Sequence, residues 1–105
     1  AQANLALMYL KGRGVSHDHK EAIKWFVRAA EQGDARAQND LGMMHENGLG
    51  VPHDDAVAYV WYSISASRGY DAARERRDVI AKRMLPTQIE QAQQRARQWQ
   101  EEHGY

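Results

Sequence analysis

Apolar residues recur three and four positions apart along most of the chain, which is the pattern of helices that each bury one side. Glycine follows these segments where a helix is expected to end. Asp18 and Asp54 precede two of them, where the side chain of an N-cap is expected. The pattern predicts four helices, over residues 1–11, about 19–32, 35–47 and about 55–68.

The chain repeats itself with a period of 36 residues. Thirteen of the first 33 residues are identical to the residue 36 positions later, where chance gives about two. The identical pairs include Trp25 with Trp61 and Ala22 with Ala58. Stacking of one helical hairpin on its copy accounts for such shared residues in one register, whereas a single buried reactive centre does not. The repeat therefore predicts a binding surface rather than a catalytic pocket.

A third, weaker copy follows residue 70. Ala73 and Ile80 continue the apolar stripe, but Arg77 stands where the first two copies have Leu5 and Leu41. A solenoid ends in a unit whose outer side tolerates water, so this copy is predicted to cap the stack. The predicted organisation is a single repeat domain, with repeat one at 1–34, trimmed at its start, repeat two at 35–70 and a degenerate capping repeat at 71–105.

The last predicted helix begins at Pro86 and Thr87. Thr87 and Glu90 have the spacing of a capping box, and proline is favourable in a first helical turn. Apolar residues three, four and three positions apart let this helix close the stack. They are Ile89, Ala92, Ala96 and Trp99.

Composition narrows the choice of partners. The chain has 14 Lys and Arg against 14 Asp and Glu, so no net charge attracts it to nucleic acid or anionic lipid. No apolar run approaches the roughly 20 residues that cross a membrane. The absence of cysteine excludes disulfides and thiolate chemistry and fits both cytoplasm and periplasm. Residue 1 falls within a repeat, which is consistent with a trimmed export signal, so the compartment stays open.

These residues resemble the Sel-one-like repeat (SLR) family, a relative of the tetratricopeptide repeats. The resemblance rests on Leu41-Gly42, on the Gly-x-Gly-Val turns, on the Trp-Phe or Trp-Tyr pairs and on Ala-Ala-Glu-Gln-Gly at 29–33. It covers residues 1–73, and the ending from Arg77 through Pro86 is similar to the terminal cap of bacterial members. The resemblance implies an all-α fold: a right-handed α-α superhelix (solenoid) of antiparallel helix pairs with C-terminal capping helices. It also implies an adaptor for other proteins.

In such a stack the first helix of each pair lines the concave face, so side chains opposite its buried stripe are candidate binding residues. At 100° per residue, Leu7 and Leu10 lie opposite Leu5, and their equivalents follow one repeat apart. Leu7, Met43 and Val79 form a predicted apolar row with a polar rim, which suits a peptide. The alternative is that the row is buried structure. The predicted partner-binding residues are Leu7, Leu10, Asn39, Met43, Glu46, Glu75, Val79 and Lys82.

The outer side of the second helix is charged in the first copy and apolar in the second. An apolar stripe of this kind requires a cover. The closing helix is the favoured cover, and a homodimer contact through the stripe is the alternative. The charged residues are Glu21, Lys24 and Arg28, and their apolar counterparts are Val57, Val60 and Ile64.

Signals for catalysis or metal binding are weak. His17, His19 and His53 lie in equivalent loops roughly 10 Å apart, too far for one metal ion. The residues after His45 do not complete a zinc-binding His-Glu-x-x-His helix. We predict no catalytic residues, no metal and no cofactor. Carboxylates on the concave side can act as acid and base, but the sequence does not indicate desolvation; they are Asp40, Glu46 and Glu75. A basic cluster is interpreted as a solvated cap rather than a contact for an acidic partner, and consists of Arg74, Arg76, Arg77, Lys82 and Arg83.

The sequence predicts a protein-protein interaction module, an adaptor that binds a peptide or a partner domain on its concave face and is not an enzyme. Two alternatives stay open. One is a hydrolase acting on cell-wall material, an activity attributed to relatives of the family. The other is the terminal structural cap of a longer repeat array. A deep pocket with convergent ionisable groups favours the enzyme, and a shallow extended trough favours the adaptor.

Overall fold

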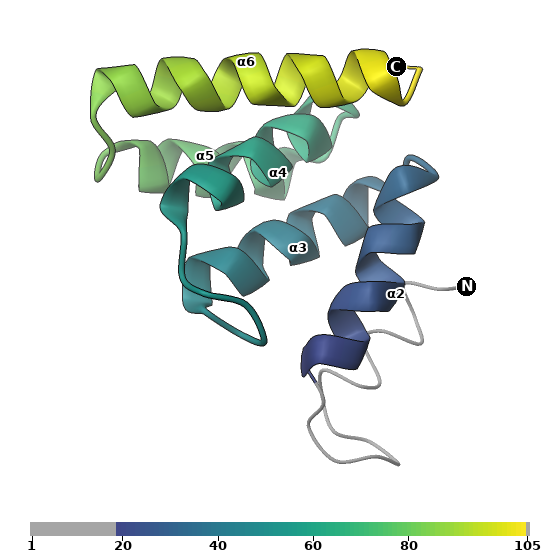
Figure 1. The fold of residues 1–105 in the computed structure, drawn as a ribbon. Helices are drawn as coiled ribbons and strands as arrows, with labels where there is room; N and C mark the ends of the chain where they lie inside the picture. Colours follow the sequence, from purple (N-terminus) through teal and green to yellow (C-terminus); the bar gives the residue numbers. More distant parts are fainter. Residues whose placement is uncertain (1–18, 105) are drawn as a thin grey trace.

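The computed structural model describes residues 19–104, and within them the chain forms helices and no strands (Figure 1). The helix predicted over residues 1–11 lies outside the described residues. The predicted all-α fold is confirmed, and the other helices lie close to their expected bounds. The five described helices are α2 (His19–Glu31), α3 (Ala35–Asn47), α4 (Asp55–Ser67), α5 (Asp71–Ala81) and α6 (Pro86–Glu102).

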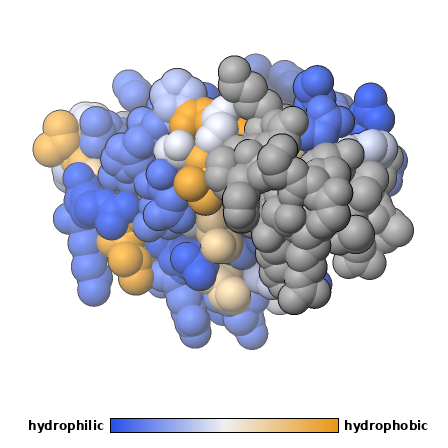
Figure 2. Space-filling model, turned by 90° about the horizontal axis from the view of Figure 1, so that it is seen from below, coloured by the Kyte–Doolittle hydropathy of each residue, from blue (hydrophilic) through white to orange (hydrophobic). Residues whose placement is uncertain are grey.

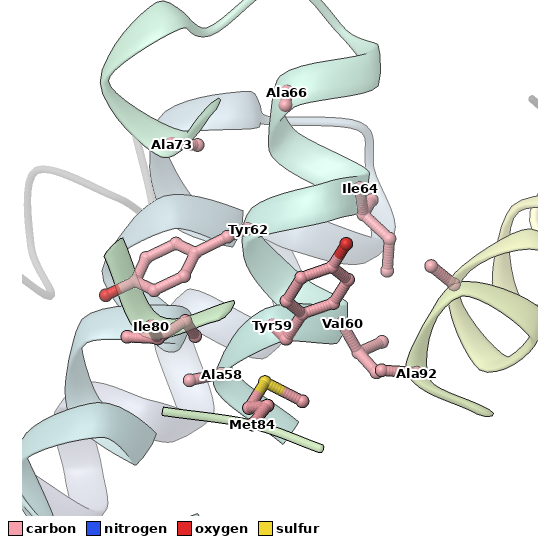
Figure 3. Close-up of a cluster of buried hydrophobic side chains, with 11 residues drawn as sticks. Ala58, Tyr59, Val60, Tyr62, Ile64, Ala66, Ala73, Ile80, Met84 and Ala92 are labelled. Atoms are coloured by element: carbon pink, nitrogen blue, oxygen red, sulfur yellow. The ribbon is translucent and has the colours of Figure 1, made fainter. Parts of the chain in front are cut away.

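Each helix from α2 to α4 packs against the next one along the chain, and α6 returns to lie along α4 (Figure 1). One core cluster joins α2 to α3 and contains Phe26 and Leu41. A second cluster joins α4, α5 and α6 and contains Tyr62 and Ile80 (Figure 3). Trp61 packs against both clusters, so the helix pairs form one continuous stack.

Aspartate side chains set the starts of two helices. Asp54 caps α4 as predicted, because its Oδ1 accepts a hydrogen bond from the Val57 amide at 3.1 Å. Asp34, which the apolar pattern does not reveal, caps α3 in the same way through the Ala37 amide at 3.1 Å. The predicted cap at Asp18 lies outside the described residues.

The start of α6 at Pro86 agrees with the prediction, but its N-terminal cap does not. The helix begins at Pro86, Leu85 occupies the N-cap position, and the Leu85 amide donates to Oε1 of Gln88 at 2.9 Å. The capping box predicted for Thr87 and Glu90 is therefore wrong. Proline has a fixed φ that suits the first helical position, so the helix starts one residue before Thr87.

Each copy has two adjacent aromatic residues, of which one lies in the core and the other at its edge. Phe26 and Tyr62 are fully buried, whereas Trp25 and Trp61 are half-buried. Trp61 meets Trp99 of α6 edge to face, with ring centroids 5.4 Å apart and planes inclined by 71°. Trp61 thus connects the closing helix to the stack.

The closing helix covers the apolar stripe of α4. Val60 and Ile64 are buried, and Figure 3 shows Ala92 of α6 beside them. Val57 stays half-buried. The favoured cover, the closing helix, is confirmed for Val60 and Ile64. The homodimer contact stays a prediction.

Candidate functional site

A pocket of about 320 Å³ opens between the C-terminal half of α3 and α5. Its lining combines three charged side chains with Val79, which is 53% exposed. Val79 and Leu85 are the large hydrophobic residues that stay exposed within residues 19–104. We call this pocket the α3–α5 groove, and it is lined by Glu46, Ala72, Glu75, Arg76 and Val79.

The structure brings three of the predicted binding residues together in this groove: Glu46, Glu75 and Val79. Lys82 is exposed but does not line the groove. Met43 is half-buried and packs against the core cluster of α4, so it adds no side chain to the groove, and Val79 is the large apolar residue there. Leu7 and Leu10 lie outside the described residues.

The prediction that Asn39 lies on the exposed rim is corrected by the structure. Asn39 is only 4% exposed, and its Nδ2 donates to Sδ of Met43 at 3.7 Å. The helical wheel places Asn39 opposite the core stripe of α3, but burial depends on what packs over that side. Asn39 is therefore part of the interior rather than of a binding surface.

Glu46 forms the fixed floor of the groove. Its side chain is 18% exposed and its two oxygens have separate partners. The Tyr62 hydroxyl donates to Oε1 at 2.6 Å, and Nη2 of Arg83 donates to Oε2 at 3.3 Å. Burial, with help from Glu46, raises the pKa of Tyr62, so the hydroxyl stays a donor at any physiological pH. Glu46 is thus held in one position and is not free to abstract a proton.

Arg83 ties this floor to the start of α4. Its Nε and Nη2 donate to the two oxygens of Asp55 at 3.2 and 3.0 Å, which is a bidentate pair. His53 also contacts Oδ1 of Asp55, at 3.1 Å. The hydrogen bonds from Arg83, above all, hold the pKa of Asp55 below its usual range. These contacts join the end of α3, the start of α4 and the segment after α5, and they meet the groove through Glu46.

Asp40 departs from the expectation that the α3 carboxylates are solvated. Burial raises its pKa to about 6, while the charges of Arg36 and Arg76 act in the opposite direction. Its Oδ2 is buried and has no hydrogen-bond partner among the described residues. Asp40 does not line the α3–α5 groove, so the three carboxylates do not converge on one point.

Two further features are absent from residues 19–104. No group of three or more His, Asp or Glu side chains in this range is placed to hold a metal ion. In the same range, no helix combines the length and apolar character that crossing a bilayer requires.

His45 is half-buried, and this burial lowers its pKa, as expected for a ring that fills a packing position.

The Tyr62–Glu46 hydrogen bond was not foreseen, although the repeat contains its signal. Tyr62 stands where the first copy has Phe26, and Glu46 stands where it has Leu10. Two apolar positions therefore became polar in the same copy, which is what a new hydrogen-bonded pair requires. The role of Arg83 has no such signal, because its contacts with Asp55 and Glu46 join residues that are 28 and 37 positions apart.

The surface on the side turned away from α6 is mainly hydrophilic, with small separate hydrophobic patches among the residues that are not drawn in grey (Figure 2). A partner that binds such a surface needs polar and charged groups as well as apolar ones.

Comparison with known proteins places this arrangement among helical repeats. The sequence matches the Sel1 repeat over residues 1–34 and 35–70. The structure is similar to c5321, a protective antigen of uropathogenic Escherichia coli strains with an SLR fold, at a TM-score of 0.91 and 33% identity. That match covers 97% of this chain and 22% of c5321.

A Sel1 repeat protein from Oxalobacter formigenes is similar at a TM-score of 0.70 and 40% identity, over 73% of this chain and 58% of that one. The chain therefore spans only part of both longer proteins. No curated protein matches the sequence.

Proposed function

The chain belongs to the Sel1 repeat family, whose members are generally scaffolds for protein interactions, and we propose that it is an adaptor that binds an extended segment of a partner protein in the α3–α5 groove. The observation that carries this proposal is the exposed Val79 in a groove that is also lined by the charged side chains of Glu75 and Arg76. An apolar side chain between charges of both signs suits a segment that presents one apolar residue flanked by polar groups.

The fixed position of Glu46 also supports binding. Glu46 is held by Tyr62 and Arg83, so this side chain loses little conformational freedom when a segment docks. Catalysis has less support, because the oxygens of Glu46 are already occupied and Asp40 lies outside the groove. Sel1 repeat proteins are typically non-enzymatic, in line with this proposal.

The closing helix supports a second role, that of a terminal cap for a longer repeat array. The side of α6 that faces away from α4 is polar and exposed, as the last unit of a solenoid requires. Its residues include Gln91, Gln94, Arg95 and Gln98. This role is compatible with binding in the α3–α5 groove, because the groove lies on other helices.

Substitution of Val79 tests the adaptor proposal. We expect Val79→Glu to reduce partner recovery about tenfold, because a carboxylate buried against an apolar side chain costs more than ~1.4 kcal/mol. The measurement is affinity capture from a lysate of the source organism with quantification of the bound proteins by mass spectrometry.

The matched control is Leu85→Glu, which changes the other exposed large hydrophobic residue, 63% exposed and outside the groove. Circular dichroism should show both variants folded. At least one protein should be retained by wild type and by Leu85→Glu but lost from Val79→Glu. If all three proteins capture the same set in equal amounts, the groove is not the binding site.

A further inference from the structure

A second pocket, of about 400 Å³, lies on the opposite side of α5 from the α3–α5 groove. Three helices form its walls, and we call it the α4–α5–α6 pocket. It shares no lining residue with the groove. The side chains on which its chemistry depends are Tyr59 and Ser63 of α4, Arg77 and Asp78 of α5, and Gln93 and Arg97 of α6.

The repeat shows that this pocket replaces what is an apolar contact in the preceding copy. One repeat earlier, the position of Arg77 is Leu41, which is 1% exposed in the core between α2 and α3. The positions of Tyr59 and Ser63 are Ile23 and Val27, which pack against that same core. Three apolar positions that meet in one copy are therefore all polar in the next. Exposure to solvent explains one change from an apolar to a polar residue, but three such changes that line the same cavity indicate a binding site.

Hydrogen-bonding groups line this pocket, and one buried oxygen among them has no partner in the described residues. The Ser63 hydroxyl oxygen is buried and has no hydrogen-bond partner among residues 19–104. No ion pair of Arg97 is found in the same part of the chain. Nε of Arg77 donates a hydrogen bond to Oδ1 of Asp78 at 3.4 Å, which leaves its two terminal amino groups as donors for a ligand. Gln93 donates to the Tyr59 hydroxyl at 3.3 Å. Buried polar groups in native proteins are normally satisfied, so the buried Ser63 hydroxyl calls for a partner. Arg77, which is half-buried, and Arg97, which is exposed, offer charged donors beside it, and together the three groups suit a ligand with acceptor oxygens.

From these observations we propose that the α4–α5–α6 pocket binds a carboxylate group, with Arg77 and Arg97 as its charged donors and Ser63 as a neutral donor. Guanidinium groups match the geometry of a carboxylate and hold it through paired hydrogen bonds. Two arginines and Asp78 give the pocket a net charge of about +1, which a bound monoanion neutralises, whereas a dianionic phosphate would leave the site with a net negative charge. The volume is in the range of small-molecule sites and also admits the C-terminal residue of a peptide.

The test is titration of the chain, followed by ¹⁵N–¹H NMR, with N-acetylalanine, its uncharged amide and inorganic phosphate at constant ionic strength. N-acetylalanine should shift amide signals of α4, α5 and α6, whereas the amide and phosphate should not. A pentapeptide with a free C-terminus identifies the source of the carboxylate. If it binds more tightly than N-acetylalanine, the ligand is a protein C-terminus; equal binding indicates a free small acid.

Two variants and a control separate binding from structure. Arg97→Gln should weaken N-acetylalanine binding by ~10-fold or more, because a charged hydrogen bond is lost. Arg77→Leu, which restores the residue of the preceding copy, should abolish binding without lowering the thermal midpoint. Arg95→Gln, on the exposed side of α6 and outside the pocket, should bind like wild type. Equal shifts with the amide, or unchanged binding in Arg97→Gln, would overturn the proposal.

Discussion

Replacing Gly42 with alanine should lower the free energy of unfolding by about 2 kcal/mol, although alanine in a helix is normally more stable than glycine by ~1 kcal/mol. A Cβ at this position of α3 would lie 2.5 and 2.6 Å from two ring carbons of Tyr62. The ring has no room to move, because Tyr62 is completely buried and Glu46 holds its hydroxyl. Gly42 is therefore required by the close approach of α4 to α3 rather than by backbone conformation.

Thermal unfolding measures this effect, and a loss of about 2 kcal/mol corresponds to a fall of roughly 10 °C in Tm for a domain of this size. The control is the same substitution in a Tyr62→Leu background, where the smaller side chain leaves room for the Cβ. There, Gly42→Ala should cost much less, and the two changes should couple strongly. A Gly42→Ala protein that is as stable as wild type would show that α3 and α4 are farther apart than described.

Asp40→Asn should stabilise the protein by about 2 kcal/mol at pH 8. The pKa of Asp40 is raised by burial from 3.8 to about 6, and the full shift corresponds to ~3 kcal/mol. We expect less than the full value because the asparagine amide must also leave water. The folded-state pKa lies above the unfolded one, so the cost of ionising Asp40 is absent below pH 3.8, grows between pH 4 and 6, and is complete above pH 6.

Urea unfolding at several pH values checks this prediction. The advantage of Asp40→Asn should be close to zero at pH 3.5 and should reach its maximum above pH 6. Glu90→Gln, an exposed site on α6, should change stability by only a few tenths of a kcal/mol at either pH. A variant that is less stable than wild type at pH 8, or a difference that does not vary with pH, would contradict the description of Asp40 as desolvated. Carboxylates held in this state are often found near functional sites, and Asp40 lies on the helix that forms one wall of the α3–α5 groove.

The positions of the helices were predictable because they depend on local rules. Apolar spacing locates α3 and α4, and Asp54 caps α4 where the sequence places it. The two copies also share a small residue and a large aromatic ring at equivalent positions, Ala6 with Phe26 and Gly42 with Tyr62, but only the structure shows that Gly42 and Tyr62 meet. The rules that locate helices act within a few residues or between two copies, so sequence alone is sufficient for them.

The groove was predictable only in part. The helical wheel correctly joined Glu46, Glu75 and Val79, because it put them on the same side of α3 and α5. It gave the wrong exposure for Asn39 and did not reveal that Met43 packs into the core, because burial depends on the neighbours of a helix as well as on its own face. The contacts of Arg83 join residues far apart in the sequence and follow no periodic rule.

The central claim is that the α3–α5 groove receives a segment of a partner protein. Its most direct test is photo-crosslinking with p-benzoylphenylalanine in place of Val79 and, separately, in place of Leu85, with the crosslinked peptides identified by mass spectrometry. The account predicts an adduct from position 79 that maps to one short segment of one protein, and no such adduct from position 85. Adducts from position 85 with none from position 79, or the same adducts from both, would contradict it.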